Sequence, residues 1–170
     1  MRARGLVRSG AMRELAAFVD SAKPYALGIC EIDAGDALSI ATRFALQWAY
    51  RGRQALFWKT PLSAHAVHDR YLPVRAARVF DRRGLLIVDA QLHGAPCMLA
   101  ATQMSGERER LIPELRFARK HLRGDRRALL FADMPVYRVA FADLGFARIA
   151  DGIHARGFSA GSLHAHVATV

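Results

Sequence analysis

The most continuous hydrophobic pattern in the chain lies between residues 84 and 102, where two apolar runs flank a short turn. The first run, 85–92, is apolar on both faces except at Asp89 and Gln91, and the second, 97–101, is apolar throughout. Strands that are apolar on both faces are typical of a sheet interior that is covered on both sides. The pattern therefore predicts two adjacent antiparallel strands, 84–92 and 97–102, joined by a turn.

The rest of the chain alternates helical and strand patterns around this hairpin. Helices are expected at about 11–20, 37–50, 107–123 and 136–144, and strands at 26–32, 54–59, 74–80, 127–132, 146–149, 152–156 and 164–170. Residues 60–73 are expected to form a loop or short helix, and residues 1–10 carry only a weak strand signal. Mixed hairpins and strand–helix–strand links exclude a purely parallel doubly wound sheet and favour an α/β sandwich.

Composition favours a single folded domain spanning residues 1–170. Hydrophobic residues make up 52% of the 170 residues and charged residues 24%, which is typical of a globular protein. No apolar run is long enough to span a membrane, and no signal-peptide pattern follows the N-terminal arginines. Cys30 and Cys97 both lie in apolar strand patterns, which predicts buried free thiols and a cytoplasmic location.

The formal net charge of +10 suits a polyanionic partner such as nucleic acid. The alternative is compositional, because abundant Arg and Ala are also what a GC-rich genome encodes whatever the function. Lysine occurs only at positions 23, 59 and 120, and the sequence contains no dense basic block. The sequence does not specify an oligomeric state.

Three acids, Glu31, Asp133 and Asp151, lie at or beside the ends of expected strands. Carboxylates in such positions can bind a hard cation such as Mg²⁺, which takes oxygen ligands. The alternative for each acid is an Arg partner or a helix-capping role. Glu31 follows a strongly apolar strand, so we expect it to have a partner, since burying an unpaired carboxylate is costly.

Histidines offer a second, zinc-based possibility. His65 and His68 have helical spacing, and His164 and His166 have strand spacing, so each pair can share one side. Neither pair has a Cys or an acid at the spacing usual for zinc sites. The sequence also lacks a Gly-rich phosphate loop, a GxSxG elbow and a CxxC motif.

The order of five short motifs resembles the endonuclease/exonuclease/phosphatase superfamily, whose fold is deoxyribonuclease-I-like. The family's Gln-Glu at the end of an early strand is matched by Cys30-Glu31, and its Thr-His-x-Ser, which precedes an Arg-rich helix, by residues 102–105 (TQMS). Its Gly-Asp-x-Asn, Asp-x-Ile and Ser-Asp-His-x-Pro-Val motifs are matched by residues 132–135 (ADMP), 151–153 (DGI) and 162–167 (SLHAHV).

The resemblance implies a compact, two-sheet α/β sandwich with mixed strands and outer helices, and a Mg²⁺- or Mn²⁺-dependent phosphodiesterase site. By the same resemblance, Glu31 would bind the metal, and Asp133 would orient or deprotonate the attacking water. His164, paired with Asp151, would stabilise the phosphate or assist the leaving group. Supporting roles would fall to Gln103, Ser105 and Ser162. The expected substrate is a phosphodiester, with nucleic acid favoured by the charge, and no membrane partner is expected.

Several positions depart from the family pattern. The family's first-strand Asn has no counterpart, Gln103 replaces a His, Pro135 an Asn and Leu163 a metal-binding Asp. Because supporting groups are each worth large factors in rate, these departures predict a partly degraded site. They also keep open a non-catalytic relative that binds nucleic acid or a protein partner, and an unrelated α/β protein with a His-based metal site.

Overall fold

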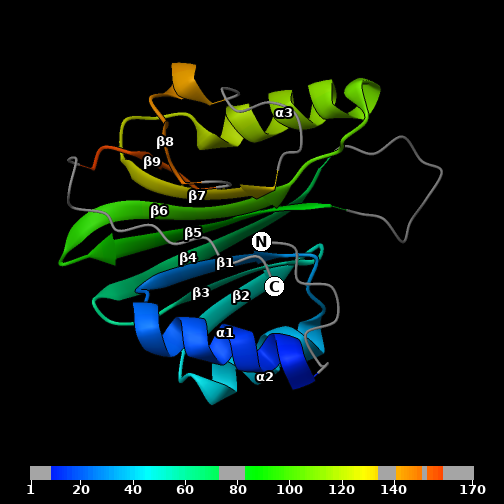
Figure 1. Cartoon of the computed structure of the whole chain (residues 1–170). Coiled ribbons are helices and arrows are strands. Elements are labelled where there is room, and N and C mark those ends of the chain that lie inside the picture. The colour runs from blue at the N-terminus through cyan, green and yellow to red at the C-terminus, as the bar shows by residue number, and fades with distance from the viewer. Residues whose placement is uncertain (1–8, 73–82, 134–140, 151–152, 159–170) are drawn as a thin grey trace.

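The computed structural model describes residues 9–72, 83–133, 141–150 and 153–158, and these form four layers (Figure 1). Two helices cover a three-stranded sheet, this sheet packs on a six-stranded sheet, and a long helix covers the outer face of the latter. The expected two-sheet α/β sandwich with mixed strands and outer helices is confirmed. No helix in the described part of the chain is long and apolar enough to cross a membrane.

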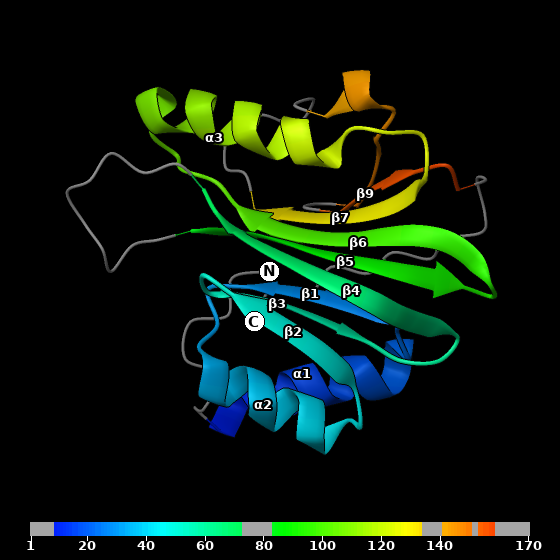
Figure 2. The ribbon, with the colours of Figure 1, turned by 180° about the vertical axis from the view of Figure 1, so that it is seen from behind.

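The three-stranded sheet is antiparallel and has the order β1-β3-β2. Figure 2 shows both N-terminal helices on its outer face. The strands are β1 (Ala26–Cys30), β2 (Gln47–Arg51) and β3 (Gln54–Trp58), and the helices are α1 (Ser9–Ala22) and α2 (Ala34–Arg43).

The six-stranded sheet has the order β4-β5-β6-β7-β9-β8, and β6 and β7 are its one parallel pair among the described strands. The crossover between them is α3 (Arg108–Leu122), which covers the outer face of the sheet. The strands are β4 (Leu62–Tyr71), β5 (Gly84–Leu92), β6 (Ala95–Gln103), β7 (Arg127–Asp133), β8 (Ala147–Ala150) and β9 (Ile153–Arg156), and a 3₁₀ turn, η2, spans Ala142–Leu144.

The layers enclose three hydrophobic clusters, one at each interface. The α1 and α2 stripes, including Leu15 and Ile40, pack on β1 and β3, and alternate β5 residues such as Leu86 and Val88 fill the space between the sheets. The opposite residues of β5 and β6, together with α3, form the outer cluster. This explains why the two central strands are apolar on both faces.

The expected hairpin at 84–92 and 97–102 is confirmed: β5 and β6 are adjacent, antiparallel and interior. The turn contains only His93 and Gly94, with φ of 51° and 78°. Two consecutive positive φ values are typical of a type I′ turn, whose twist matches that of the flanking strands.

The helix expected at 37–50 is wrong in its second half, because α2 ends at Arg43 and β2 follows. Ala45 takes a left-handed conformation with φ of 50°, and the N–H of Leu46 donates to the carbonyl of Ala41 at 2.9 Å. These are the features of a Schellman C-cap, which usually contains glycine and is harder to recognise when the residue is alanine. At the other end, Asp33 is the N-cap of α2, since its side chain accepts the N–H of Asp36 at 2.8 Å.

The loop or short helix expected at 60–73 is also wrong, because β4 occupies most of this segment. β4 pairs along its length with β5 and is an edge strand that carries a bulge between Ala64 and Ala66. Most of its side chains are exposed, so no regular alternation of polar and apolar residues marks it as a strand. The strands expected at 74–80 and 164–170, and most of the helix at 136–144, lie outside the described residues.

Both cysteines are buried and free, as their apolar surroundings predicted. The expected helix at 107–123 and the strands at 54–59, 127–132, 146–149 and 152–156 are confirmed to within about three residues. The motifs at 30–31, 102–105 and 132–133 therefore follow or end the strands expected to carry them.

Candidate functional site

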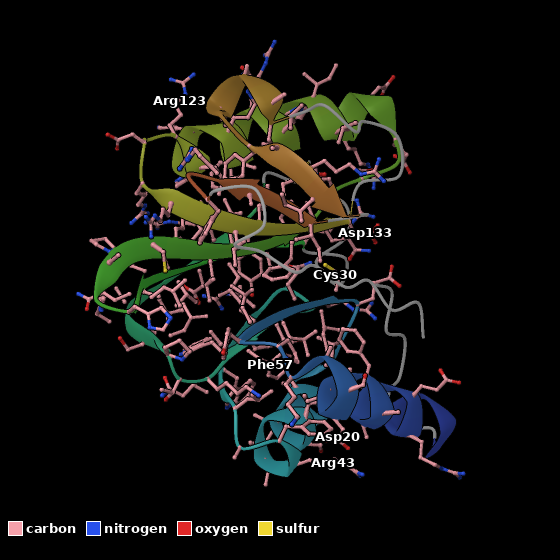
Figure 3. All side chains as sticks on the ribbon, turned by 60° about the vertical axis from the view of Figure 1, so that its left-hand side comes forward. Asp20, Cys30, Arg43, Phe57, Arg123 and Asp133 are labelled. Atoms are coloured by element: carbon pink, nitrogen blue, oxygen red, sulfur yellow. The ribbon has the colours of Figure 1, made fainter. Side chains whose placement is uncertain are left out.

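The C-terminal ends of β1, β6 and β7 meet at one end of the sandwich. β6 and β7 run parallel, and their last paired residues are Gln103 and Asp133. β1 belongs to the other sheet but packs against β6, and its terminal Cys30 thiol contacts the Thr102 carbonyl at 3.6 Å. Figure 3 shows Cys30 and Asp133 close together where the two sheets meet. The ends of these strands bring Glu31, Gln103 and Asp133 into one site.

Gln103 connects the two acids through a single nitrogen atom. The residue is only 8% exposed, and its Nε2 donates to Glu31 Oε1 at 2.8 Å and to Asp133 Oδ2 at 3.4 Å. Two carboxylates within reach of the same nitrogen repel each other, and the amide N–H groups offset part of this repulsion. The partner expected for Glu31 therefore includes the Gln103 amide.

Glu31 has an unusual backbone conformation for a residue with a side chain. Its φ is 60°, in the left-handed region, directly after β1 ends. Such a conformation costs about 1–3 kcal/mol in a residue other than glycine and concentrates at functional sites. The next residue, Ile32, is held by a hydrogen bond from its N–H to the Arg53 carbonyl at 3.1 Å, so the conformation is stabilised by the β2–β3 turn.

Cys30 lies beneath the two acids but is unsuited to nucleophilic chemistry. Burial raises the pKa of its thiol from 9.0 to about 12, and the nearby Asp133 carboxylate contributes in the same direction. The thiol therefore stays protonated at neutral pH, and the thiolate is the reactive form. Cys30 instead donates to the Thr102 carbonyl and thereby links the two sheets below the site.

Ser105 has partners that belong to the start of α3. Its hydroxyl oxygen accepts the N–H of Glu107 at 3.1 Å, and its own N–H donates to the buried Glu114 carboxylate at 2.7 Å. The N–H of Met104 donates to the Asp133 carbonyl at 3.1 Å, which continues the β6–β7 pairing. These bonds fix the segment that follows Gln103. No sequence signal distinguished Glu114, which anchors this segment, from the other charged residues of α3.

The remaining site predictions concern the C-terminal part of the chain. Asp151, Ser162 and His164 lie outside the described residues, so the Asp151–His164 pair stays a prediction. The His65–His68 pair loses its helical spacing because β4 is a strand, and His68 Nε2 instead contacts Asp89 Oδ2 at 2.9 Å.

The site offers few side chains that could bind a divalent cation. Within the described ranges, no group of three or more His, Cys, Asp or Glu side chains is arranged to hold a metal ion. Mg²⁺ is commonly bound through only one or two carboxylates and keeps several waters. Glu31 and Asp133 supply two carboxylates, and the repulsion between them would be relieved by a cation. The residues present therefore fit a weakly held, oxygen-ligated ion.

No protein-family model matches the sequence, and no curated protein matches it. Solved structures do match. They include an endonuclease/exonuclease/phosphatase family protein from Bacteroides thetaiotaomicron, with 14% identity, TM-score 0.67, and coverage of 85% of this chain and 66% of that chain. A mannosyl-6-phosphatase from the same organism has 14% identity, TM-score 0.65, and coverage of 78% and 61%.

A third match is D. rerio TDP2 complexed with single-strand DNA product, with 12% identity, TM-score 0.60, and coverage of 78% and 56%. The chain spans roughly half to two thirds of the length of the structures it matches. At these identities the similarity establishes the fold and not the activity. The chain has the deoxyribonuclease-I-like fold of the endonuclease/exonuclease/phosphatase superfamily, in agreement with the order of its sequence motifs.

Proposed function

We propose that this protein is a divalent-metal-dependent phosphoesterase that hydrolyses phosphodiester bonds at the site formed by Glu31, Gln103 and Asp133. The observation that carries the proposal is the convergence of two carboxylates on one buried amide where three strands end. The phosphatase and endonuclease/exonuclease/phosphatase names among proteins of the same fold support it.

Glu31 is the proposed metal ligand, and Mg²⁺ or Mn²⁺ the proposed ion. When bound, such an ion neutralises negative charge on the phosphate oxygens and polarises the phosphorus–oxygen bond. The left-handed backbone and the Gln103 contact hold the Glu31 carboxylate in place before any ligand arrives. Pre-positioned groups of this kind need no reorganisation during the reaction.

Asp133 is the proposed general base. Its carboxylate takes a proton from the attacking water as the new oxygen–phosphorus bond forms and the bond to the leaving oxygen breaks in line. His164, paired with Asp151, is the candidate for assisting the leaving group, as the family resemblance implies. Cys30 contributes a neutral, buried floor to the site and takes no part in the proton transfers.

The proposed substrate is a phosphodiester, with nucleic acid as the favoured class. The net charge of +10 supports a polyanionic substrate because it raises the local concentration of anions and the association rate. The single-strand DNA product in the D. rerio TDP2 structure is consistent with this class.

The purified protein is expected to hydrolyse bis(p-nitrophenyl) phosphate or nick plasmid DNA when Mg²⁺ is added, and chelation should stop the reaction. With few carboxylate ligands, the ion requirement is expected near 10⁻³ M, about the weak end of oxygen-ligand sites. Glu31→Gln should raise the Mg²⁺ concentration for half-maximal rate by roughly 10- to 100-fold because it removes a charged ligand.

Glu109→Gln is the matched control, since this exposed residue lies on α3 and the substitution changes the charge equally. It should leave the Mg²⁺ requirement unchanged. If neither substrate is hydrolysed in a metal-dependent manner, the proposal fails. The alternative, a non-catalytic relative that binds nucleic acid, would then be tested by salt-sensitive retention on DNA.

A further inference from the structure

The Gln103 side chain occupies the position between Glu31 and Asp133 that a bound cation would need. Its Nε2 faces both carboxylates, and the side chain is almost fully buried. An amide nitrogen offers partial positive charge and two N–H donors, so without metal it stabilises two carboxylates held close together.

The main chain on either side of this amide is fixed, so movement is confined to the side chain. Gln103 is paired with Asp133 in the β6–β7 ladder, the preceding carbonyl accepts the Cys30 thiol, and the following N–H donates to the Asp133 carbonyl. Rotation about the terminal side-chain bond, whose preference is broad and roughly two-fold, would exchange the positions of Nε2 and Oε1.

The two ends of the amide have opposite consequences for a cation. With Nε2 toward the carboxylates, the amide N–H groups repel a positive ion. They also donate to carboxylate lone pairs that would otherwise bind the ion. With Oε1 in the same place, the amide supplies a third oxygen ligand of the kind that hard cations accept. Only the second orientation is compatible with an ion between Glu31 and Asp133.

We propose that the Gln103 amide is an exchangeable substitute for the metal. In the metal-free protein, Nε2 holds Glu31 and Asp133 together, and on cation binding the amide turns over so that Oε1 faces the ion. This inference rests on the proposed metal site and adds to it a residue that sets metal affinity. Gln103 thus acts as a positioning residue that makes the metal-free site stable and the binding of metal weak.

Side-chain amide NMR tests the exchange directly. In the metal-free protein, one Gln103 NH₂ resonance pair, identified by its absence in Gln103→Glu, should be protected from solvent exchange because it is hydrogen-bonded and buried. Titration with Mg²⁺ should shift this pair and remove its protection. Persistence of the protected resonances at saturating Mg²⁺, while neighbouring backbone signals shift, would overturn the proposal, and so would the absence of any Mg²⁺-induced shift at the site.

The substitution Gln103→Glu should lower stability but raise metal affinity, a combination that a purely structural role would not produce. Gln103→Glu removes the N–H donor, so Tm without metal should fall by about 5 °C. The same substitution adds an anionic ligand, so Mn²⁺ should bind more tightly, with a dissociation constant lower by about tenfold or more when measured by calorimetry. Gln103→Leu removes both ends of the amide and should lower Tm without improving Mn²⁺ affinity.

Gln91→Glu is the control for charge alone, because Gln91 pairs with Pro96 at the opposite end of the β5–β6 hairpin. Gln91→Glu should change neither the Tm without metal nor the Mn²⁺ dissociation constant appreciably. Weaker Mn²⁺ binding by Gln103→Glu than by the wild type would contradict the exchange. If Mg²⁺ turns the Gln103 amide over but no phosphodiester is hydrolysed, the proposed catalytic function is rejected and the proposed role of Gln103 stands. If phosphodiesters are hydrolysed but the amide does not turn over, the role of Gln103 is rejected and the catalytic function stands.

Discussion

Asp133→Asn is expected to lower the rate of metal-dependent phosphodiester hydrolysis by roughly 10²- to 10⁴-fold, the range usual for loss of a general base. The asparagine keeps the size of the side chain but cannot accept the proton of the attacking water. The contact with Gln103 Nε2 can persist through the amide oxygen. The fold and thermal stability should therefore change little, as circular dichroism and thermal unfolding would show.

Asp125→Asn provides a matched control. Asp125 lies exposed in the turn between α3 and β7, at the end of β7 opposite to Asp133. It makes the same change in charge, and the rate should stay within about twofold of the wild-type value, since removing one exposed charge has little effect at a distance. Equal hydrolysis by Asp133→Asn and the wild type would remove Asp133 from the proposed mechanism.

Gly28→Ala is expected to destabilise the protein by about 1–3 kcal/mol, as overpacking of a filled core does. A Cβ at Gly28 would lie 2.3 Å from Cγ and 2.5 Å from Cβ of Phe131 on the opposite sheet. Gly28 lies in β1 shortly before Glu31, and Phe131 lies in β7 shortly before Asp133, so relief of this clash would also change the separation of the two acids. A displacement of about 1 Å can cost a hundredfold in rate.

Urea unfolding measures the change in stability, and Gly35→Ala is its control. Gly35 lies in the first turn of α2, where an added Cβ would meet only the Asp33 carboxylate at an ordinary 3.4 Å. That variant should be as stable as the wild type or slightly more stable, because alanine favours helix. A Gly28→Ala protein with wild-type unfolding free energy would show that the sheets are not in close contact at this point.

The features that the sequence predicted are those encoded by local pattern. The apolar runs of β5 and β6 are interior on both faces, so their composition alone identifies them as central strands. Glu31 and Asp133 were placed at strand ends because each directly follows or closes an apolar run. The order of short motifs then indicated the fold, which the solved structures support.

The features that the sequence did not predict depend on contacts between distant segments. β4 is held by pairing with β5 across the intervening residues and has little apolar character of its own. The end of α2 is set by the left-handed conformation of Ala45, although the high helix propensity of alanine predicts that the helix would continue there. In the site, Gln103 was interpreted as the loss of a histidine, and its contact with both acids requires β1 and β7 to be brought together from opposite sheets.

The most direct test of the proposed metal-dependent site is the position of Mn²⁺ in a crystal of the wild-type protein, located by anomalous scattering. We expect one ion bound by the Glu31 carboxylate at about 2.1 Å, near the distance usual for small hard cations, with Asp133 beside it and the Gln103 oxygen turned toward it. An ion located elsewhere on the chain would contradict the account. So would a crystal at saturating Mn²⁺ with no ion near Glu31 and Gln103 Nε2 still between the two carboxylates.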